Sequence, residues 1–363
     1  MGSVSYAQEQ HLASLAVQRA AILTKNVMRS VKHIAKTDST PVTVADFVAQ
    51  ALLISALHRA FPSDGFIGEE TADVLREDAT LRQQVWELVG ATELENAADE
   101  ALLAKPSSSE EMMHHIDLGG RGVGTRNGRT WVMDPIDGTA TFIRGGQYAV
   151  ALALLEDGKE VVGVVACPNL LHPDLARIED TPVDVEGYGI MLSTALGEGV
   201  ILRPVGKGSL LPGQHVSARR PAPPTANGLI DPTSWNFVDS TMGEKYHLQN
   251  VKRFASTVGA LFPGTDVWST HVRLIVLGLG ARQGGNVQVR IPPRAEGNDP
   301  EDYIWDYAGS QLILSELGGK ATDLDGREID FGAGRRLSRN WGLVAAPGWL
   351  HFEVLHRVQE FVG

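Results

Sequence analysis

Apolar residues recur at helical spacing through the first sixty residues of the chain. The spacing predicts two helices, over 7–35 and 46–61, separated by a polar turn segment at 36–43. A short strand is predicted at 66–70, where the apolar run ends in two acids. Helical spacing then returns over 79–104 and stops at a Pro- and Ser-rich segment.

The hydrophobic pattern changes after Thr130, where short apolar runs replace helical spacing. A strong turn sequence, Glu156-Asp157-Gly158-Lys159, joins two of these runs and predicts a hairpin. The segment 203–235 is rich in Pro and Gly and is predicted to be an exposed loop. The predicted strands lie at 131–133, 148–155, 160–167, 187–194 and 199–202.

The last hundred residues alternate helix and strand patterns. Helices are predicted at 271–280, 305–317 and 349–362, and strands at 287–291 and 342–346. Helices come first, then an antiparallel-looking sheet, then mixed elements. This order predicts a layered α/β architecture with two subdomains.

The composition excludes several classes of partner. The 363 residues carry a net charge of −12, so an acidic surface should repel nucleic acid and anionic membranes. No stretch approaches the ~20 apolar residues of a membrane span. The single cysteine, Cys167, follows a Val-rich run and is predicted to be a core residue. We expect a soluble, cytoplasmic protein, because one cysteine cannot form an internal disulfide.

The run Asp134-Pro135-Ile136-Asp137-Gly138-Thr139 carries the most chemistry. It places two carboxylates three residues apart directly after an apolar strand. Facing one point around a tight turn, they would suit a hard divalent cation, which prefers oxygen ligands. Gly138 allows close approach of the backbone to a ligand, and Thr139 adds a hydroxyl. The same residues could also form an ordinary polar turn.

Other acids lie at predicted strand ends or helix starts, and each has a simpler explanation. Asp46 and Asp306 could be helix caps. Glu69 and Glu70 could form a solvated turn, and Asp117 precedes a Gly-Gly pair. Acting together, these acids could instead bind metal ions, and bound cations would explain how so acidic a chain binds an anionic substrate.

The order of these segments resembles the magnesium-dependent, lithium-sensitive phosphomonoesterases that include inositol monophosphatase. Within that superfamily the chain most resembles the fungal 3'(2'),5'-bisphosphate nucleotidases. Those enzymes remove the 3'-phosphate of adenosine 3',5'-bisphosphate, a by-product of sulfation, and some act on its sulfated form. The segments that carry the resemblance are Lys36 with Ser39-Thr40-Pro41-Val42-Thr43 and Asp46, Gly68-Glu69-Glu70, Asp134 to Thr139, Arg144 to Val150, Ala166 to Leu170, Ile304 to Gly309 and Asp330-Phe331-Gly332.

The resemblance implies a fold and a set of metal ligands. The fold would be an αβαβα sandwich, with an antiparallel-rich N-terminal subdomain over 1–182 and a smaller mixed C-terminal subdomain over 183–363. Glu69, Asp134 and the carbonyl of Ile136 would hold one Mg²⁺. Asp134, Asp137 and Asp306 would hold a second.

The resemblance also implies catalytic and substrate contacts. A third, weaker Mg²⁺ site would involve Glu69 and Asp46. Asp46 paired with Thr139 would orient and deprotonate the attacking water, and no covalent intermediate is needed. The backbone N–H groups of Gly138 and Thr139 would hold phosphate oxygens. The counterparts of the family's nucleotide contacts are His247, Thr270, Arg273 and Arg290.

Two positions depart from the nucleotidase pattern. Ala140-Thr141 stands where the fungal enzymes have Lys-Gly, and Gly146 replaces a usual Glu. The expected partner is therefore a small phosphate ester, adenosine 3',5'-bisphosphate first. An inositol phosphate or another small ester is the alternative. A non-catalytic nucleotide sensor and a sugar bisphosphatase are less favoured, and both a monomer and a homodimer fit the sequence.

Overall fold

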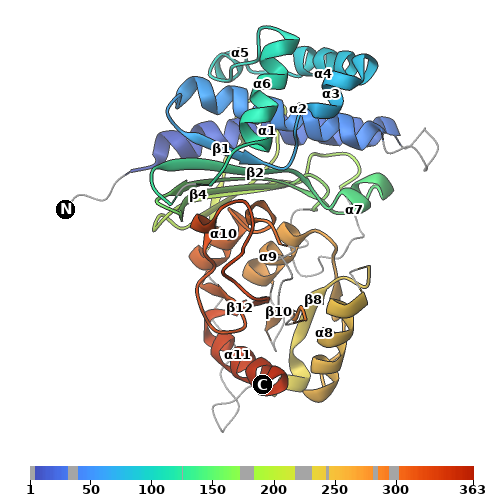
Figure 1. Cartoon of the computed structure of the whole chain (residues 1–363), viewed down its shortest axis with the longest axis vertical. Helices are drawn as coiled ribbons and strands as arrows, with labels where there is room; N and C mark the ends of the chain where they lie inside the picture. The colour runs from blue at the N-terminus through green and yellow to red at the C-terminus, as the bar shows by residue number, and fades with distance from the viewer. Residues whose placement is uncertain are drawn as a thin grey trace.

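The computed structural model describes residues 5–31, 40–124, 126–171, 184–216, 231–242, 245–280, 285–293 and 302–363. The side chains of residues 31, 40–43 and 245–247 fall outside this description. Five layers follow one another along the long axis of the molecule: helices, a sheet, helices, a second sheet and helices (Figure 1). The predicted layered αβαβα architecture is therefore confirmed.

The larger sheet has seven strands in chain order, and only its first pair, β1 and β2, is parallel. The two central strands, β3 and β4, are buried along most of their length because helices cover both faces. Leu152 and Leu154 belong to the core on one face, and Ala151 and Ala153 to the core on the other. The strands are β1 (Gly65–Gly68), β2 (Arg129–Asp137), β3 (Ala149–Glu156), β4 (Lys159–Cys167), β5 (Ile190–Ala195), β6 (Val200–Pro204) and β7 (Gln214–Val216).

Helices form the outer layer over this sheet. The long helix α1 (Ala7–Val31) matches its prediction, but α2 (Thr40–Ala60) begins six residues before Asp46. The predicted start is wrong because the polar segment with Pro41 has the composition of a turn, whereas the first turn of a helix also accepts proline. The other helices of this layer are α3 (Asp73–Glu77), α4 (Ala79–Ala91), α5 (Ala97–Glu100) and α6 (Ser109–Gly120).

Two predictions within this layer need correction. The pattern over 79–104 is not one helix, because α4 ends at Ala91 and Asn96 caps the separate helix α5. Asp117 is not at a strand end or helix start. It lies within α6, where it accepts a hydrogen bond from the Ala72 N–H and pairs with Arg76.

The smaller sheet has five strands in the order β11-β12-β10-β8-β9. Helices α9 (Thr270–Leu279) and α10 (Ser310–Glu316) lie between the two sheets, and α8 (Lys245–Thr257) and α11 (Gly348–Val362) cover the outer face (Figure 1). The strands are β8 (Asn236–Asp239), β9 (Thr265–Asp266), β10 (Asn286–Arg290), β11 (Gly319–Thr322) and β12 (Leu343–Pro347).

The predicted helix 305–317 is divided in two. A 3₁₀ turn, η2 (Ile304–Asp306), comes first, and α10 starts only after Gly309. Gly309 has φ 92°, a left-handed conformation that suits glycine and interrupts a helix. Two further 3₁₀ turns are η1 (Pro232–Ser234) and η3 (Phe331–Ala333).

The predicted subdomain boundary at 182/183 stays a prediction. Residues 172–183 are outside the described part of the chain, and the larger sheet continues beyond them through β5, β6 and β7. β7 lies within the stretch 203–235 that was predicted to be loop. Cys167 is buried in the sheet core, as predicted, and its thiol is not paired. No described helix is both long and apolar enough to cross a membrane.

A buried carboxylate joins the larger sheet to the segment before α10. Glu160 Oε1 on β4 accepts a hydrogen bond of 2.6 Å from the Gly309 N–H. The approach is close because β4 has Gly163 there, where a Cβ would lie 2.5 Å from the Gly309 carbonyl. Burial raises the pKa of Glu160 to about 7, and the backbone donors oppose this only in part.

The Glu160→Gln substitution tests this link. The folded pKa of Glu160 exceeds the unfolded value, so its contribution to stability is present below about pH 4.5 and lost as the pH rises through about 7. Gln keeps the acceptor without the charge. We expect E160Q to exceed the wild type in unfolding free energy by about 2 kcal/mol at pH 8, and the gap to close towards pH 5. Urea unfolding at both pH values measures this.

Glu316→Gln provides the control, because Glu316 is half-exposed and accepts hydrogen bonds from the N–H groups of Gly197 and Gly199. E316Q should not gain stability at pH 8. If E160Q is destabilised equally at both pH values, the buried charge of Glu160 does not lower the stability of the wild type at pH 8.

Candidate active site

The two carboxylates of the central motif are aligned by a β-bulge. Asp134 pairs with Ala151 and Asp137 with Ala149, so three steps on β2 match two on β3. In a regular strand, residues three apart point to opposite faces, and the extra residue brings them back to the same face. Pro135, which lacks an N–H donor, lies inside the irregularity, where a ladder bond is missing anyway. The sequence predicted a tight turn here, but the structure has a bulged strand.

Glu69 comes to the same place because β1 runs parallel to β2. Gly68 is the register partner of Met133, so the residue after β1 emerges beside Asp134. Gln50 of α2 fixes this strand end: its amide donates to the carbonyl of Glu70 at 2.7 Å and accepts from the Glu70 N–H at 3.0 Å.

Gly138 turns the chain from β2 into the short helix α7 (Thr139–Arg144). Its φ of 95° is left-handed, and a Cβ there would lie 3.2 Å from that of Ser269. Thr139 is exposed, and its hydroxyl donates to the Ile136 carbonyl at 3.2 Å. Thr141 is buried, and its hydroxyl contacts the carbonyls of Gly138 (2.8 Å) and Gln147 (2.5 Å). Thr141 therefore ties the two ends of this turn together.

The start of α9 holds Asp137. Asp137 Oδ2 accepts hydrogen bonds from the Ser269 hydroxyl at 2.6 Å and from the His271 N–H at 2.7 Å. The contact joins the layer between the sheets to the end of β2. Asp306 in η2 is held in the same manner, because its Oδ2 accepts from the Tyr303 N–H at 2.8 Å.

Asp46 and Asp134 are buried with one oxygen unsatisfied. Oδ1 of each side chain is enclosed and accepts no hydrogen bond from the part of the chain that the structure describes. The predicted Asp46–Thr139 hydrogen bond is not formed. The pKa of Asp46 is raised well above its usual range. Burial is the largest cause, and the negative charges of Glu70 and Glu69 raise it further.

The acids act on one another electrostatically. The pKa of Asp134 is raised well above its usual range, first by burial and then by the charges of Glu69, Asp137, Asp306 and Asp46. Burial raises the pKa of Asp306 to about 8, although the hydrogen bond from the Tyr303 N–H opposes this rise. Burial also raises the pKa of Glu70 to about 7. The negative charge of these carboxylates is therefore not fully balanced by positive groups among the described residues.

Among the described residues, Arg335 faces this group. Arg335 donates to the carbonyls of Gly68 (2.8 Å) and Gly119 (2.9 Å), and its guanidinium lies 4.7 Å from the centre of the Trp305 ring. Its charge lowers the pKa of Glu69 in part, but desolvation and the charge of Asp137 still raise it overall.

The donor set fits a hard divalent cation. It consists of carboxylates and a backbone carbonyl, two of the carboxylates have a buried unsatisfied oxygen, and a dication would supply the missing positive charge. Within the described ranges, no three His, Cys, Asp or Glu side chains are gathered tightly enough to enclose a metal ion. The structure thus brings the predicted acids to one site but does not close them around one point.

The predicted substrate contacts are engaged within the protein. Arg273 pairs with Asp239 at 3.0 Å and donates to the Thr270 hydroxyl at 3.1 Å. Arg290 pairs with Asp302 at 2.8 Å. His247 lies in α8, but its side chain is outside the described residues. Their role towards a substrate stays a prediction.

Four residues that organise the site were not found from the sequence: Gln50, Ser269, His271 and Arg335. Gln50 could have been noticed as a polar residue inside an apolar helix. Ser269 has the signal of an N-cap before an apolar helix. Nothing local distinguishes His271 or Arg335, because their contacts join distant segments.

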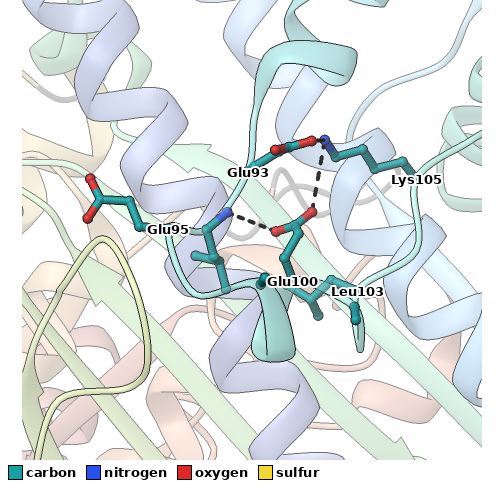
Figure 2. Close-up of a pocket in the computed structure, with 8 residues that line it drawn as sticks. Glu93, Glu95, Glu100, Leu103 and Lys105 are labelled. Carbon is teal, nitrogen blue, oxygen red and sulfur yellow. Dashed lines mark hydrogen bonds and ion pairs between the residues drawn. The ribbon is translucent and has the colours of Figure 1, made fainter.

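A pocket away from the acids of this site offers less chemistry. This pocket, beside α5, has a volume of about 650 Å³. Glu93, Glu95, Glu100 and Lys105 are among the residues that line it (Figure 2). Lys105 pairs with Glu93 at 2.9 Å, and the buried Arg19 pairs with Glu100 at 2.8 Å. None of the acids at the ends of β1 and β2 lines it. Its charges secure the loop between α4 and α5.

Comparison with known proteins identifies the family. The family model described as "Inositol monophosphatase family" matches residues 6–363. The chain belongs to the inositol monophosphatase family. It is 38% identical to the 3'(2'),5'-bisphosphate nucleotidase of Emericella nidulans, over 98% of this chain and 99% of that one. It is 36% identical to the enzyme of the same name from Schizosaccharomyces pombe, over 94% and 92% of the two chains.

Solved structures of inositol monophosphatase-family proteins share the fold. Mycobacterium tuberculosis SuhB superposes with a TM-score of 0.56 at 20% identity, covering 99% of both chains. Inositol monophosphatase II of Staphylococcus aureus has a TM-score of 0.56 at 18% identity, with 98% and 92% covered. The inositol monophosphatase family is metal-dependent and generally uses Mg²⁺, and the acids described above are the residues suited to such an ion.

Gly120→Ala tests how the strand end that carries Glu69 is positioned. A Cβ at Gly120 would lie 2.0 Å from the Glu70 carbonyl oxygen, so the acidic segment must shift. We expect G120A to lower unfolding stability by about 1–3 kcal/mol and to reduce Mg²⁺-dependent phosphatase activity. Thermal unfolding and phosphate release measure the two effects.

Gly90→Ala is the matched control, because a Cβ at Gly90 in α4 meets nothing within 4 Å. In G90A, activity should be unchanged and the helix more stable by about 1 kcal/mol. Equal behaviour of the two variants would contradict the close packing of Gly120 on Glu70.

Proposed function

We propose that this protein is a Mg²⁺-dependent phosphatase that removes the 3'-phosphate of adenosine 3',5'-bisphosphate. The observation that carries the proposal is the group of mutually repelling acids at the ends of β1 and β2, with Asp134 buried among four others. Full-length similarity to two fungal enzymes named 3'(2'),5'-bisphosphate nucleotidase supports the choice of substrate. Lithium sensitivity and a role in sulfur assimilation belong to the same proposal.

The metal ligands are assigned as follows in this proposal. Glu69, Asp134 and the Ile136 carbonyl hold one Mg²⁺, and Asp134, Asp137 and Asp306 hold a second. Bound Mg²⁺ neutralises phosphate charge, lowers the pKa of water and stabilises the leaving oxygen. Oδ2 of Asp137 and Oδ2 of Asp306 already accept protein hydrogen bonds, so the Oδ1 atoms are the oxygens that each residue would offer first to an ion. A third, weaker ion would lie between Glu69 and Asp46.

Asp46 and Thr139 act on the attacking water. Asp46 Oδ1 is buried without a partner, which suits a base that accepts a proton from water. The Thr139 hydroxyl is exposed at the turn after β2 and donates to the Ile136 carbonyl. The backbone N–H groups of Gly138 and Thr139 would hold the phosphate oxygens.

One alternative has a specific observation in its favour. The side chains predicted to contact a nucleotide already have partners: Arg273 with Asp239, and Arg290 with Asp302. Ala140-Thr141 also provides no basic side chain beside the turn. Both observations favour a diverged enzyme acting on an inositol phosphate or another small ester. The same metal chemistry would serve either substrate.

Location and assembly follow from weaker indications. Burial raises the pKa of the Cys167 thiol, so it is unreactive. A single inert thiol suits a reducing compartment, and we propose the cytoplasm. Both a monomer and a homodimer are compatible with the proposed activity.

Phosphate release from three esters tests the function. The substrates are adenosine 3',5'-bisphosphate, inositol 1-phosphate and inositol 1,4-bisphosphate, each with and without Mg²⁺. We expect Mg²⁺-dependent release that is fastest from the nucleotide, and release reduced to background in Asp134→Asn, because Asp134 is shared by both ions.

Asp323→Asn is the control for the loss of a buried carboxylate. Asp323 is fully buried and accepts hydrogen bonds from the N–H groups of Asp325 and Arg327 in the turn after β11. D323N should retain Mg²⁺-dependent turnover in its folded fraction. Equal or faster release from an inositol phosphate would instead establish the alternative substrate, and no Mg²⁺-dependent release from any ester would refute the proposal.

Asp46→Asn separates the base from the main metal ligands. The change removes the proton acceptor, so we expect kcat to fall about 100-fold, with KM and the Mg²⁺ affinity of the two main sites nearly unchanged. Steady-state kinetics over a range of Mg²⁺ concentrations measure this. A wild-type kcat in D46N would remove Asp46 from the reaction.

A further inference from the structure

One histidine joins the segments that carry Asp137 and Asp306. His271 is fully buried as the second residue of α9, in the layer between the two sheets (Figure 1). Its backbone N–H donates to Asp137 Oδ2 at 2.7 Å. Its ring Nε2 lies 2.9 Å from the carbonyl oxygen of Trp305, the residue directly before Asp306. A single residue therefore contacts both places.

The ring can make its contacts in only one neutral form. A carbonyl oxygen only accepts, so Nε2 must carry the hydrogen that points to Trp305. Nδ1 is then an acceptor, and the Ser310 hydroxyl, 2.7 Å away, is its donor. The ring thus bridges η2 and the first residue of α10.

The protein binds only one oxygen of each of the two carboxylates, Asp137 and Asp306, through the hydrogen bonds that the structure describes. Ser269 and His271 occupy Oδ2 of Asp137, and the Tyr303 N–H occupies Oδ2 of Asp306. The protein therefore fixes the orientation of each group through one oxygen. The relative position of the two remaining oxygens depends on how firmly η2 is held against α9, and the His271 ring makes that connection.

We propose that His271 is a positioning residue that sets the separation of Asp137 and Asp306 and thereby the affinity of the second metal site. The inference rests on the proposed assignment of these two acids as Mg²⁺ ligands. Outer groups that orient metal ligands commonly change affinity 10- to 100-fold when removed. His271 does not touch the substrate and carries no proton in the reaction.

Two substitutions separate the hydrogen bonds from packing. His271→Leu keeps a bulky apolar side chain and removes both ring contacts. His271→Gln places an amide N–H the same number of bonds from Cβ as Nε2, so it can still donate to the Trp305 carbonyl. The backbone bond to Asp137 survives in both variants.

The chain offers a matched control. His351 in α11 is also buried, and its Nε2 contacts the Thr322 hydroxyl (3.1 Å) and the Val344 carbonyl (3.2 Å). His351→Leu is the same chemical change in a layer that carries none of the acids. Any general effect of losing a buried histidine should appear in H351L as well.

The experiment is a titration of the full-length protein with Mn²⁺, without substrate, followed by electron paramagnetic resonance. Mn²⁺ replaces Mg²⁺ at oxygen ligands and reports binding directly. We expect one of the two tighter Mn²⁺ binding steps of H271L to lose about 10-fold or more in affinity, H271Q to lie within about 3-fold of the wild type, and H351L to be unchanged. Thermal unfolding of each variant accompanies the titration.

The outcomes distinguish this inference from the function. If folded H271L binds Mn²⁺ as tightly as the wild type, or if H271L and H351L lose affinity equally, the proposed role of His271 is overturned. The proposed function would still stand in that case, provided that the wild-type protein releases phosphate. If H271L fails to fold, the test depends on H271Q, which keeps a donor for the Trp305 carbonyl. A 10-fold loss of Mn²⁺ affinity in folded H271Q would then overturn the inference that this hydrogen bond sets the affinity. A wild-type protein that neither binds Mn²⁺ nor releases phosphate would remove both proposals.

Discussion

The constraint on which the rest depends is the repulsion among acids that the fold holds together. Burying a carboxylate without a partner is costly, and placing several side by side raises the cost further. Asp134 is in this position, with its own oxygen unsatisfied and four acids close enough to raise its pKa. A protein keeps such a group only if many other contacts stabilise the surrounding structure. The bulge in β2, the Gln50 amide and the start of α9 are therefore best understood as parts that hold this charge in place.

The layered architecture supplies those contacts from both sides. Leucines on one face of β3 pack towards the outer helices, and alanines on the other face leave room for the layer that contains α9 and α10. Gly163 and Gly309 allow the backbone of β4 and the segment before α10 to approach closely. Asp306 can reach the end of β2 only because this layer lies so near the sheet.

Much of the fold and of the acid set could be predicted from the sequence, because the signals are local. The strand before Asp134 and the hairpin at Asp157 are short patterns, and both are present. The start of α2 was mistaken because a polar segment with Pro41 is typical of a turn and is also accepted in the first turn of a helix. Arg335 and His271 act through contacts with segments far away in the chain, which a single sequence does not encode locally. Arg273 looked like a substrate contact, but only the folded chain brings Asp239 beside it.

Backbone groups also help to secure the acids. The N–H groups of Tyr303 and His271 hold Asp306 and Asp137, and the carbonyl of Gly68 receives Arg335. A main-chain donor is the same whatever residue provides it. The bond that orients Asp306 therefore does not depend on which side chain stands at position 303. That side chain could change over evolutionary time, and with it what the protein binds, while this contact to the reactive centre is kept.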